Sequence, residues 1–307
     1  MADEQQAAVG VDIGGTKIAA GIVMPDGRVL SPRTVLTPVQ EGPEAVLQTI
    51  IRQVRDLLDE TPGRNIRAVG IGTAGMVDSG RGVIVHANPN LPGWTGMPLG
   101  ESVSKAVGLP VYVDNDVNAL AVGEGRFGAG RAFREIVYVA VGTGIGGALV
   151  RHGEIWRGIH FGAGEVAYLV SGWDEQGRPI IVEDRASGPA MEKQYQAVSG
   201  SAERLSLRQI AERAHSGDML AVQVIEEGAR VLGLVLGPLV AAIDPEILIV
   251  GGGVPQIGDL WWNTFETALR DSPLPVLQQV KLAPARLSVH AGLIGAGALA
   301  LNALPGL

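Results

Sequence analysis

One short segment of the sequence carries the residue types that proton transfer requires. Residues 111–119 read VYVDNDVNA, so acidic and amide side chains directly follow an apolar stretch. Phosphoryl transfer asks mainly for a carboxylate near the attacking hydroxyl group, charge neutralisation and exclusion of water. On local grounds Asp116 and Asn118 could equally cap a helix, because an alanine-rich helix is expected to begin here. Asp116 is therefore a candidate base with a structural alternative.

Two glycine-rich turns follow apolar strands in a similar way. The first is DIGGTK at Asp12–Lys17, and the second is GTGIGG at Gly142–Gly147. Such turns present backbone N–H groups without side chains in the way, which is what phosphate oxygens need. A lone glycine-rich loop can be no more than a tight turn, but two of them predict a phosphate cradle and two related halves. Neither matches the P-loop or a complete dinucleotide fingerprint, so hydride transfer is a poor fit.

Polar side chains and further loops could complete a ligand site. Asp12 could hold Mg²⁺ through water, while three side chains of the two turns could donate to phosphates, namely Thr16, Lys17 and Thr143. Gly251–Gly253 could let the backbone approach a flat ligand such as adenine, or could be a simple exit from a strand. The loop at 86–94 offers amides for hydroxyl groups and an indole for packing.

The composition indicates a folded protein and disfavours several partners. With 307 residues, 46% of them hydrophobic, the chain can form two α/β lobes with a cleft between them. The 32 acidic residues exceed the 24 basic ones, which argues against a nucleic acid partner. The chain has no cysteine, so it has no disulfides or thiolate metal sites, which fits the cytoplasm. We expect no signal peptide at its start. We also expect no membrane partner, because its longest apolar stretch, 231–243, is too short to span a membrane.

Periodicity predicts the elements that position these motifs. Strands are expected at 7–13, 17–23 and 29–36 as a meander, then at 66–71, 83–86 and 111–113. A helix should begin at Pro43 and bury one face, formed by Val46, Ile50, Val54 and Leu57. The second half restarts with strands at 136–141 and 147–150, and a last strand is expected at 247–250. Its helices are expected at 187–197, 207–214 and 216–243, the last with Ser216 as N-cap.

Six motifs, in this order, resemble the glucokinases of the repressor/open-reading-frame/kinase (ROK) family. They are DIGGTK at Asp12–Lys17, GTAG at Gly72–Gly75, NPNLPGW at Asn88–Trp94, DNDVNA at Asp114–Ala119, GTGIGG at Gly142–Gly147 and GAGE at Gly162–Glu165. The resemblance spans nearly the whole chain and implies an α/β, two-lobed actin-like ATPase fold with ribonuclease-H-like lobes. Residues 1–117 plus 293–307 would form the small lobe and 118–292 the large lobe. Sugar and ATP would bind in the cleft between them.

The resemblance also implies a role for individual residues. Asp116 would be the catalytic base. Sugar contacts would come from Gly75, Asn90, Asn115 and Glu165. Mg²⁺ and the phosphates would be surrounded by Asp12, Gly14, Gly15, Thr16, Lys17, Thr143 and Gly144, with Gly252 and Gly253 on the adenosine side. The resemblance further implies a homodimer.

The sequence departs from the family at the segment that binds zinc. The family has a histidine and a cysteine knuckle after its GE pair, but the corresponding positions here hold Tyr168, Asp174, Gln176 and Ile181. These residue types do not make a tetrahedral structural zinc site, so we predict no zinc. Tyr168 could replace the lost hydrogen bond to the sugar or could simply pack in the core. Glu183 could remain a sugar ligand.

Together these features predict an ATP-dependent hexose kinase that converts glucose to glucose 6-phosphate with Asp116 as general base. N-acetylmannosamine, another hexose or an aminosugar remains open as the substrate, and polyphosphate remains open as the donor. A sugar-sensing repressor is disfavoured, because Asp12 comes too early for a DNA-reading module and the chain is acidic. A non-catalytic sugar-binding protein is a further alternative.

Overall fold

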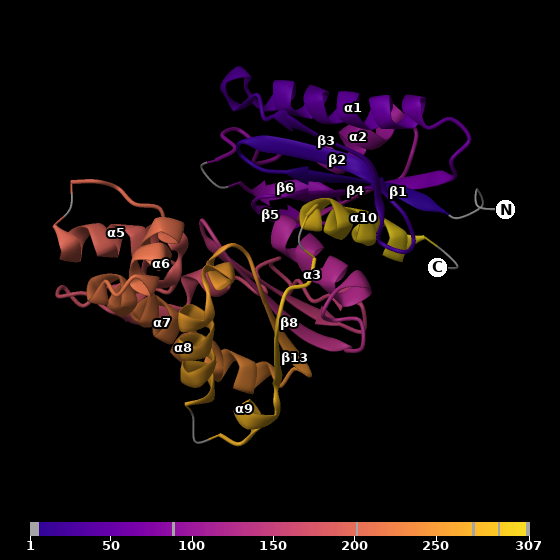
Figure 1. Ribbon diagram of the computed structural model, residues 1–307. Helices are drawn as coiled ribbons and strands as arrows, with labels where there is room; N and C mark the ends of the chain where they lie inside the picture. The colour runs from indigo at the N-terminus through magenta and orange to yellow at the C-terminus, as the bar shows by residue number, and fades with distance from the viewer. Residues whose placement is uncertain (1–5, 88–89, 201, 272–273, 288, 305–307) are drawn as a thin grey trace. The chain divides into compact units, whose positions relative to one another are not determined.

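The chain folds into two compact units, which are traced in the computed structural model (Figure 1). The structure describes residues 6–87, 90–200, 202–271, 274–287 and 289–304. Unit 1 comprises Met1–Ala132, Gly153–Ala163 and Arg286–Leu307, and unit 2 comprises Phe133–His152 and Gly164–Ala285. The division differs from the predicted boundaries at 117 and 293. Helix α3 (Asp116–Phe127) stays with unit 1 because it packs on α10 (Ala291–Ala303).

Unit 1 is built on a mixed sheet with the strand order β3-β2-β1-β4-β7. The bounds are β1 (Ala7–Ile13), β2 (Lys17–Val23), β3 (Val29–Leu36), β4 (Ile66–Thr73) and β7 (Val111–Asn115). The first three strands form the predicted antiparallel meander, whereas β4 and β7 run parallel to β1. The carboxyl ends of β1, β4 and β7 therefore meet at one edge. There, Asp12 is in register with Gly72, and Gly72 with Asp114.

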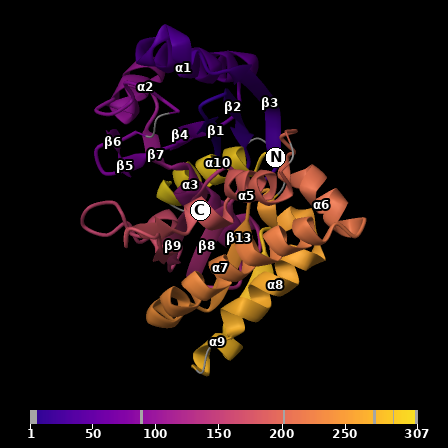
Figure 2. The ribbon, with the colours of Figure 1, turned by 90° about the vertical axis from the view of Figure 1, so that its left-hand side faces the viewer.

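Helices cover both faces of this sheet (Figures 1 and 2). Helices α1 (Pro43–Glu60) and α2 (Leu99–Val107) lie on one face, and α10 and α3 lie on the other. The predicted apolar face of α1 is buried in the core together with alternate residues of β1. Smaller elements of unit 1 are η1 (Val39–Glu41), the hairpin of β5 (Met76–Asp78) and β6 (Val83–His86), and β10 (Glu154–Ile155).

The contact between α10 and the sheet is unusually close because glycines line it. A Cβ at Gly70 would lie 1.8 Å from the carbonyl oxygen of Ala296, and one at Gly10 would lie 2.3 Å from that of Leu293. The first turn of α10 also meets Asp12, since a Cβ at Gly292 would lie 2.1 Å from its Oδ2 atom. The glycine contacts thus set how near α10 comes to the carboxyl end of β1.

Unit 2 repeats the pattern of unit 1 around its own central strand. Four strands of its sheet lie in the order β9-β8-β13-β14, namely β8 (Glu135–Val141), β9 (Ile145–Arg151), β13 (Ile247–Gly251) and β14 (Lys281–Pro284). Strand β8 is antiparallel to β9 and parallel to β13, just as β1 is antiparallel to β2 and parallel to β4. In both units the glycine turn joins the central strand to its antiparallel partner. The two halves predicted from these turns are therefore confirmed.

The remaining elements of unit 2 are mostly helical. They are η2 (Val166–Tyr168), β11 (Val170–Trp173), β12 (Pro179–Ile181), α4 (Glu183–Ala186), α5 (Gly188–Ser199), α6 (Leu207–His215), α7 (Met219–Ile243), η3 (Val254–Ile257), α8 (Asp259–Arg270) and α9 (Val276–Gln279). The N-cap of α7 is Asp218, which accepts from two backbone N–H groups, whereas Ser216 ends α6. The prediction of Ser216 as N-cap is wrong. Along the described ranges, no helix combines the length and apolar character of a membrane span.

Replacing Gly70 with alanine tests the contact between α10 and the sheet. We expect Gly70→Ala to lower the free energy of unfolding by about 2 kcal/mol or more, because backbone atoms of α10 would have to move. Gly80→Ala is the control, since Gly80 lies in an exposed turn and its Cβ would be 3.5 Å from the nearest atom. Chemical denaturation measures both. Equal unfolding free energies for the two variants would contradict the close contact.

Candidate active site

Two carboxylates, Asp12 and Asp116, interact at the carboxyl edge of the unit 1 sheet. Asp12 lies near the end of β1, and Asp116 is the first residue of α3. Burial, and secondly the charge of Asp116, raises the pKa of Asp12 from 3.8 to about 6. Burial also raises the pKa of Asp116, against the opposing effect of a hydrogen bond from the Val117 N–H group. A carboxylate with a raised pKa is a stronger base, as proton abstraction from a hydroxyl group requires.

The cap of α3 is Asn115 rather than Asp116 or Asn118. Its Oδ1 atom accepts from the N–H groups of Val117 and Asn118, at 2.8 and 3.2 Å. Asp116 follows as the first helical residue, and the Asn118 side chain donates instead to Asp114. The capping alternative for Asp116 and Asn118 is therefore wrong, because the N-cap is Asn115, although Asp116 Oδ1 also accepts from the neighbouring Val117 N–H group over 2.9 Å.

Asn115 also binds Gly75, so two predicted sugar-contacting residues are held to each other. The Nδ2 atom of Asn115 donates to the carbonyl oxygen of Gly75 over 2.9 Å. Gly75 has φ of 102°, and a Cβ there would lie 2.4 Å from the carbonyl oxygen of His86, so the fold itself requires glycine. The Asn115 side chain also forms a hydrogen bond with Asp116, so it links Gly75 to the candidate base.

The glycine turn of unit 1 lies beside another predicted sugar contact, Asn90. The turn closes through a hydrogen bond from Gly14 N–H to the carbonyl oxygen of Lys17, and Thr37 Oγ1 donates to Gly14. A Cβ at Gly15 would lie 2.9 Å from that of Asn90. Thr16 and Lys17 are both exposed, as expected for groups that meet a phosphate.

The loop that carries Asn90 is anchored by a buried indole. Trp94 is buried, and its Nε1 atom donates to Thr73 Oγ1 over 3.2 Å. The packing role expected for this indole is therefore confirmed. Asn88 and Pro89, which belong to the same sequence motif, lie outside the described residues.

The glycine turn of unit 2 exposes Thr143 and Gly144 and contacts a carboxylate. The Gly142 N–H group closes the turn by donating to Gly144, and Glu183 at the start of α4 accepts from the Ile145 N–H group over 2.7 Å. A Cβ at Gly144 would lie 2.6 Å from Glu183 Oε2. The predicted sugar ligand Glu183 is thus placed on the predicted phosphate turn.

Glu165 and Tyr168 lie on the surface of unit 2. A contact between two glycines holds this segment on β9, since a Cβ at Gly164 would lie 2.8 Å from the carbonyl oxygen of Gly147. Glu165 is exposed, and Tyr168 is 68% exposed. The alternative that Tyr168 packs in the core is therefore wrong, because an internal side chain would not present two thirds of its surface to water.

The third glycine cluster contains one glycine that the fold does not require. The fold requires glycine at positions 251 and 252. A Cβ at Gly251 would lie 2.3 Å from Tyr138 Oη, and one at Gly252 would lie 2.2 Å from the carbonyl oxygen of Val141. Gly253 has an ordinary helical φ of −81°, and a Cβ there would meet no atom within 4 Å. The alternative of a simple exit from strand β13 therefore explains Gly251 and Gly252. Gly253 instead leaves open space that a ligand can approach.

An ion pair between Asp174 and Arg178 closes the turn at the positions that correspond to the zinc knuckle described above. Asp174 accepts from the N–H groups of Gln176 and Arg178, and Arg178 Nε donates to its other oxygen over 2.6 Å. This pairing closes the turn between β11 and β12, while Ile181 lies in β12 and Tyr168 in η2. The carboxylate already has a cation, and among the residues that the structure describes no group of His, Cys, Asp and Glu side chains could hold a metal ion. These residues do not fit zinc.

Asp12, in contrast, suits a hard divalent cation. Carboxylate oxygens are the ligands that Mg²⁺ prefers, and the ion commonly keeps several of its waters. Burial and the nearby charge of Asp116, which raise the pKa of Asp12, make its negative charge costly. A cation that arrives with a nucleotide would compensate that charge.

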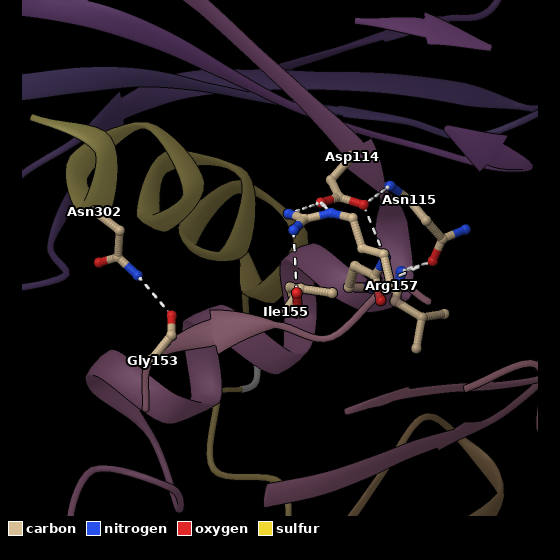
Figure 3. A network of polar contacts seen from close by, with 8 residues as sticks. Asp114, Asn115, Gly153, Ile155, Arg157 and Asn302 are labelled. Carbon is tan, nitrogen blue, oxygen red and sulfur yellow. Dashed lines mark hydrogen bonds and ion pairs between the residues drawn. The ribbon is translucent and has the colours of Figure 1, made fainter. Parts of the chain in front are cut away.

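Sequence reasoning missed two residues beside the candidate base, Asp114 and Arg157. Asp114 is buried, and the Arg157 guanidinium group donates to it (Figure 3). Asp114 was visible as an acidic residue at a strand end. Arg157 gave no local signal, because it lies 43 residues away along the chain.

Comparisons with known proteins agree on one family. The sequence model described as the ROK family matches residues 8–303. A glucokinase of Streptomyces coelicolor is 34% identical over 95% of this chain and 96% of its own. An N-acetylmannosamine kinase of Escherichia fergusonii is 30% identical over 94% of this chain and 97% of its own.

Solved structures give the same result. The ROK hexokinase of Thermus thermophilus superposes with a TM-score of 0.83 and 33% identity, covering 96% of this chain and 97% of its own. The ROK glucokinase of Streptomyces griseus, in complex with glucose and AMPPNP, gives a TM-score of 0.77 and 35% identity over 95% and 98%. The predicted actin-like ATPase fold is confirmed.

The charge of Asp12 should show in the stability of the protein without ligands. Because its folded pKa exceeds its ordinary value, the native state binds this proton more tightly, and stability is lost as pH rises from about 4 to about 6. Asp12→Asn should remove this loss and raise the unfolding free energy at pH 7.5 by on the order of 1–3 kcal/mol. Asp26→Asn is the control, since Arg28 lowers the pKa of Asp26. Denaturation of both variants across this pH range checks the sign, and an unchanged slope for Asp12→Asn would refute it.

Proposed function

The chain belongs to the ROK family, and from this we propose that it is a cytoplasmic sugar kinase that transfers the γ-phosphoryl group of ATP to a hexose. Glucose is the first substrate to expect, with glucose 6-phosphate as the product. Glucokinases align over nearly the whole chain, and one related structure holds glucose and AMPPNP. We also propose the homodimer that the resemblance implies.

The observation that carries this proposal is the position of Asp116. Its carboxylate stands at the carboxyl edge of the sheet, has a raised pKa and is not needed as a helix cap. In the proposed reaction, the sugar 6-hydroxyl oxygen forms a bond to the γ-phosphorus while the bond to the bridging oxygen of ADP breaks. Asp116 accepts the hydroxyl proton.

The other candidate residues position the two substrates. The sugar would be oriented by Gly75, Asn90, Asn115, Glu165, Tyr168 and Glu183. The phosphates would be bound by Gly14, Gly15, Thr16, Lys17, Thr143 and Gly144, and the adenosine by Gly252 and Gly253. Asp12 would hold Mg²⁺ through water, and this ion would neutralise phosphate charge. We propose that zinc has no part, because Asp174 is paired with Arg178.

N-acetylmannosamine is the second candidate substrate. An N-acetylmannosamine kinase is 30% identical to this chain, which lies within the range of 28–34% found for three glucokinases. The exposed Tyr168 stands where the family places a zinc-bound histidine that touches the sugar, so this position bears on which hydroxyl groups are accepted. A purely sugar-binding role is disfavoured, because it gives no reason for the basic carboxylate of Asp116.

The proposed reaction predicts the behaviour of Asp116→Asn. We expect turnover to fall by about 10²–10⁴-fold, the contribution of a general base, while the dissociation constant for glucose stays nearly constant. A coupled ADP-release assay and calorimetric sugar titration measure the two quantities. Asp59→Asn, which changes an exposed carboxylate on α1, should retain full activity.

The same assay identifies the substrates when it is run across hexoses and N-acetylhexosamines, with ATP or polyphosphate as donor. Protein stripped by a chelator and resupplied with Mg²⁺ alone should be fully active. Near-normal turnover of Asp116→Asn would rule out the mechanism. Absence of sugar-dependent ADP release from the wild-type protein would rule out the function.

Gly253→Ala tests the adenosine contact separately from folding. The KM for ATP should rise on the order of tenfold, equivalent to about 1.4 kcal/mol of binding, while stability and the KM for glucose stay unchanged. Gly252→Ala is the matched contrast and should lower stability, because Gly252 has φ of 94° and closely approaches Val141. An unchanged KM for ATP in Gly253→Ala would exclude the contact.

A further inference from the structure

The side chain of Arg157 reaches the segment that carries the proposed base. We infer that Arg157 is a positioning residue for phosphoryl transfer, because its ion pair with Asp114 fixes the first turn of α3 and so the direction of the Asp116 carboxylate. This inference rests on the proposed function. Arg157 acts through Asp114 and not on the substrate.

The pair is held at more than one point and is shielded from water (Figure 3). Both Nε and Nη2 of Arg157 donate to Asp114 Oδ2, the first over 2.9 Å, and Nη1 donates to the carbonyl oxygen of Ile155 over 3.1 Å. The Asp114 side chain is 3% exposed and that of Arg157 is 30% exposed. A planar guanidinium group with several engaged donors fixes the orientation of a carboxylate, which a single ammonium group does not.

The other oxygen of Asp114 holds the first turn of α3. Its Oδ1 atom accepts from the N–H group of Asn115 and from Nδ2 of Asn118, each over 2.8 Å. Asn115 in turn caps the helix and binds Gly75. Asp114 therefore joins the end of β7 to the turn in which Asp116 is the first residue. The orientation of the Asp114 carboxylate therefore determines that of the Asp116 carboxylate.

Arg157 also compensates charge where charge is costly. Asp114 is aligned through Gly72 with Asp12, so three acidic residues gather at the ends of β1 and β7. Removing one partner of a buried ion pair leaves the other charge without compensation. Without Arg157, the Asp114 carboxylate would lose the donors that fix its orientation. Its contacts with Asn115 and Asn118 would then be disturbed.

The backbone of Arg157 organises the loop that precedes the GAGE motif. The segment Gly153–Ala163 belongs to unit 1, and the carbonyl oxygen of Arg157 accepts from the N–H group of Ala163 over 3.1 Å. A purely structural anchor for this segment would affect stability alone. A positioning residue affects the rate of the chemical step in molecules that are folded and bind sugar.

The experiment compares Arg157→Ala and Arg157→Lys with the control Arg126→Ala. Arg126 lies near the other end of α3 and donates to Asn302, so the control removes an arginine attached to the same helix. Turnover, KM values, calorimetric glucose binding and thermal unfolding are measured for each protein. Added guanidinium ion at low millimolar concentration tests chemical rescue of Arg157→Ala.

We expect kcat of Arg157→Ala to fall by about 10²-fold, as misplacement of a catalytic group by about 1 Å does, with glucose affinity nearly unchanged and partial rescue by guanidinium. Arg157→Lys, which keeps the charge but not the planar donors, should fold normally and lose roughly tenfold in kcat. Arg126→Ala should keep the wild-type kcat.

A wild-type kcat in Arg157→Lys, or in the folded fraction of Arg157→Ala, would overturn the inference and leave only a structural anchor. If Arg157→Ala does not fold, the Lys variant decides alone. Failure of the proposed function looks different, because the wild-type protein itself would then release no ADP with any sugar, and both claims would fall together.

Discussion

The structure of unit 1 depends on keeping three carboxylates together at one edge of a sheet. Asp12, Asp114 and Asp116 come from β1, β7 and the start of α3, and burial raises the pKa of the first and the last. Desolvated charge of one sign is costly unless it is paired or hydrogen-bonded. Asp114 has its arginine, whereas in the described part of the chain neither Asp12 nor Asp116 forms an ion pair with a cationic side chain. In the proposed reaction, Asp12 would receive a cation and Asp116 a proton.

Several local features serve to hold this arrangement. Glycines in β1 and β4 let α10 approach the sheet closely, and the first turn of that helix meets Asp12. Asn115 takes over the capping of α3, which leaves the next position for an acid. The glycine turns of the two units are equivalent hairpin turns. Among the described residues, a Cβ at Gly142 in the second turn, or at Gly253 after β13, would meet no atom within 4 Å. The glycines that the fold requires are thus different from those that leave space for a ligand.

The sequence allowed prediction of the features that are local. The apolar runs in residues 7–36 predicted the three meander strands at the bounds that the structure has, and helical spacing predicted the buried face of α1. Choices between neighbouring polar residues were less certain. Asn115 rather than Asp116 caps α3, and Asp218 rather than Ser216 caps α7, because each competing pair has similar capping ability. Arg157 could not be found, since its partner is distant in sequence and only the folded chain brings them together.

The central claim is that Asp116 faces the attacking hydroxyl group of a sugar. The most direct measurement is a crystal structure of this protein with glucose and a non-hydrolysable ATP analogue with Mg²⁺. We predict the sugar 6-hydroxyl oxygen within about 2.6–3.2 Å of an Asp116 carboxylate oxygen, the reach of a general base. A bound sugar whose 6-hydroxyl group lies against another residue, with Asp116 out of hydrogen-bonding distance, would contradict the account.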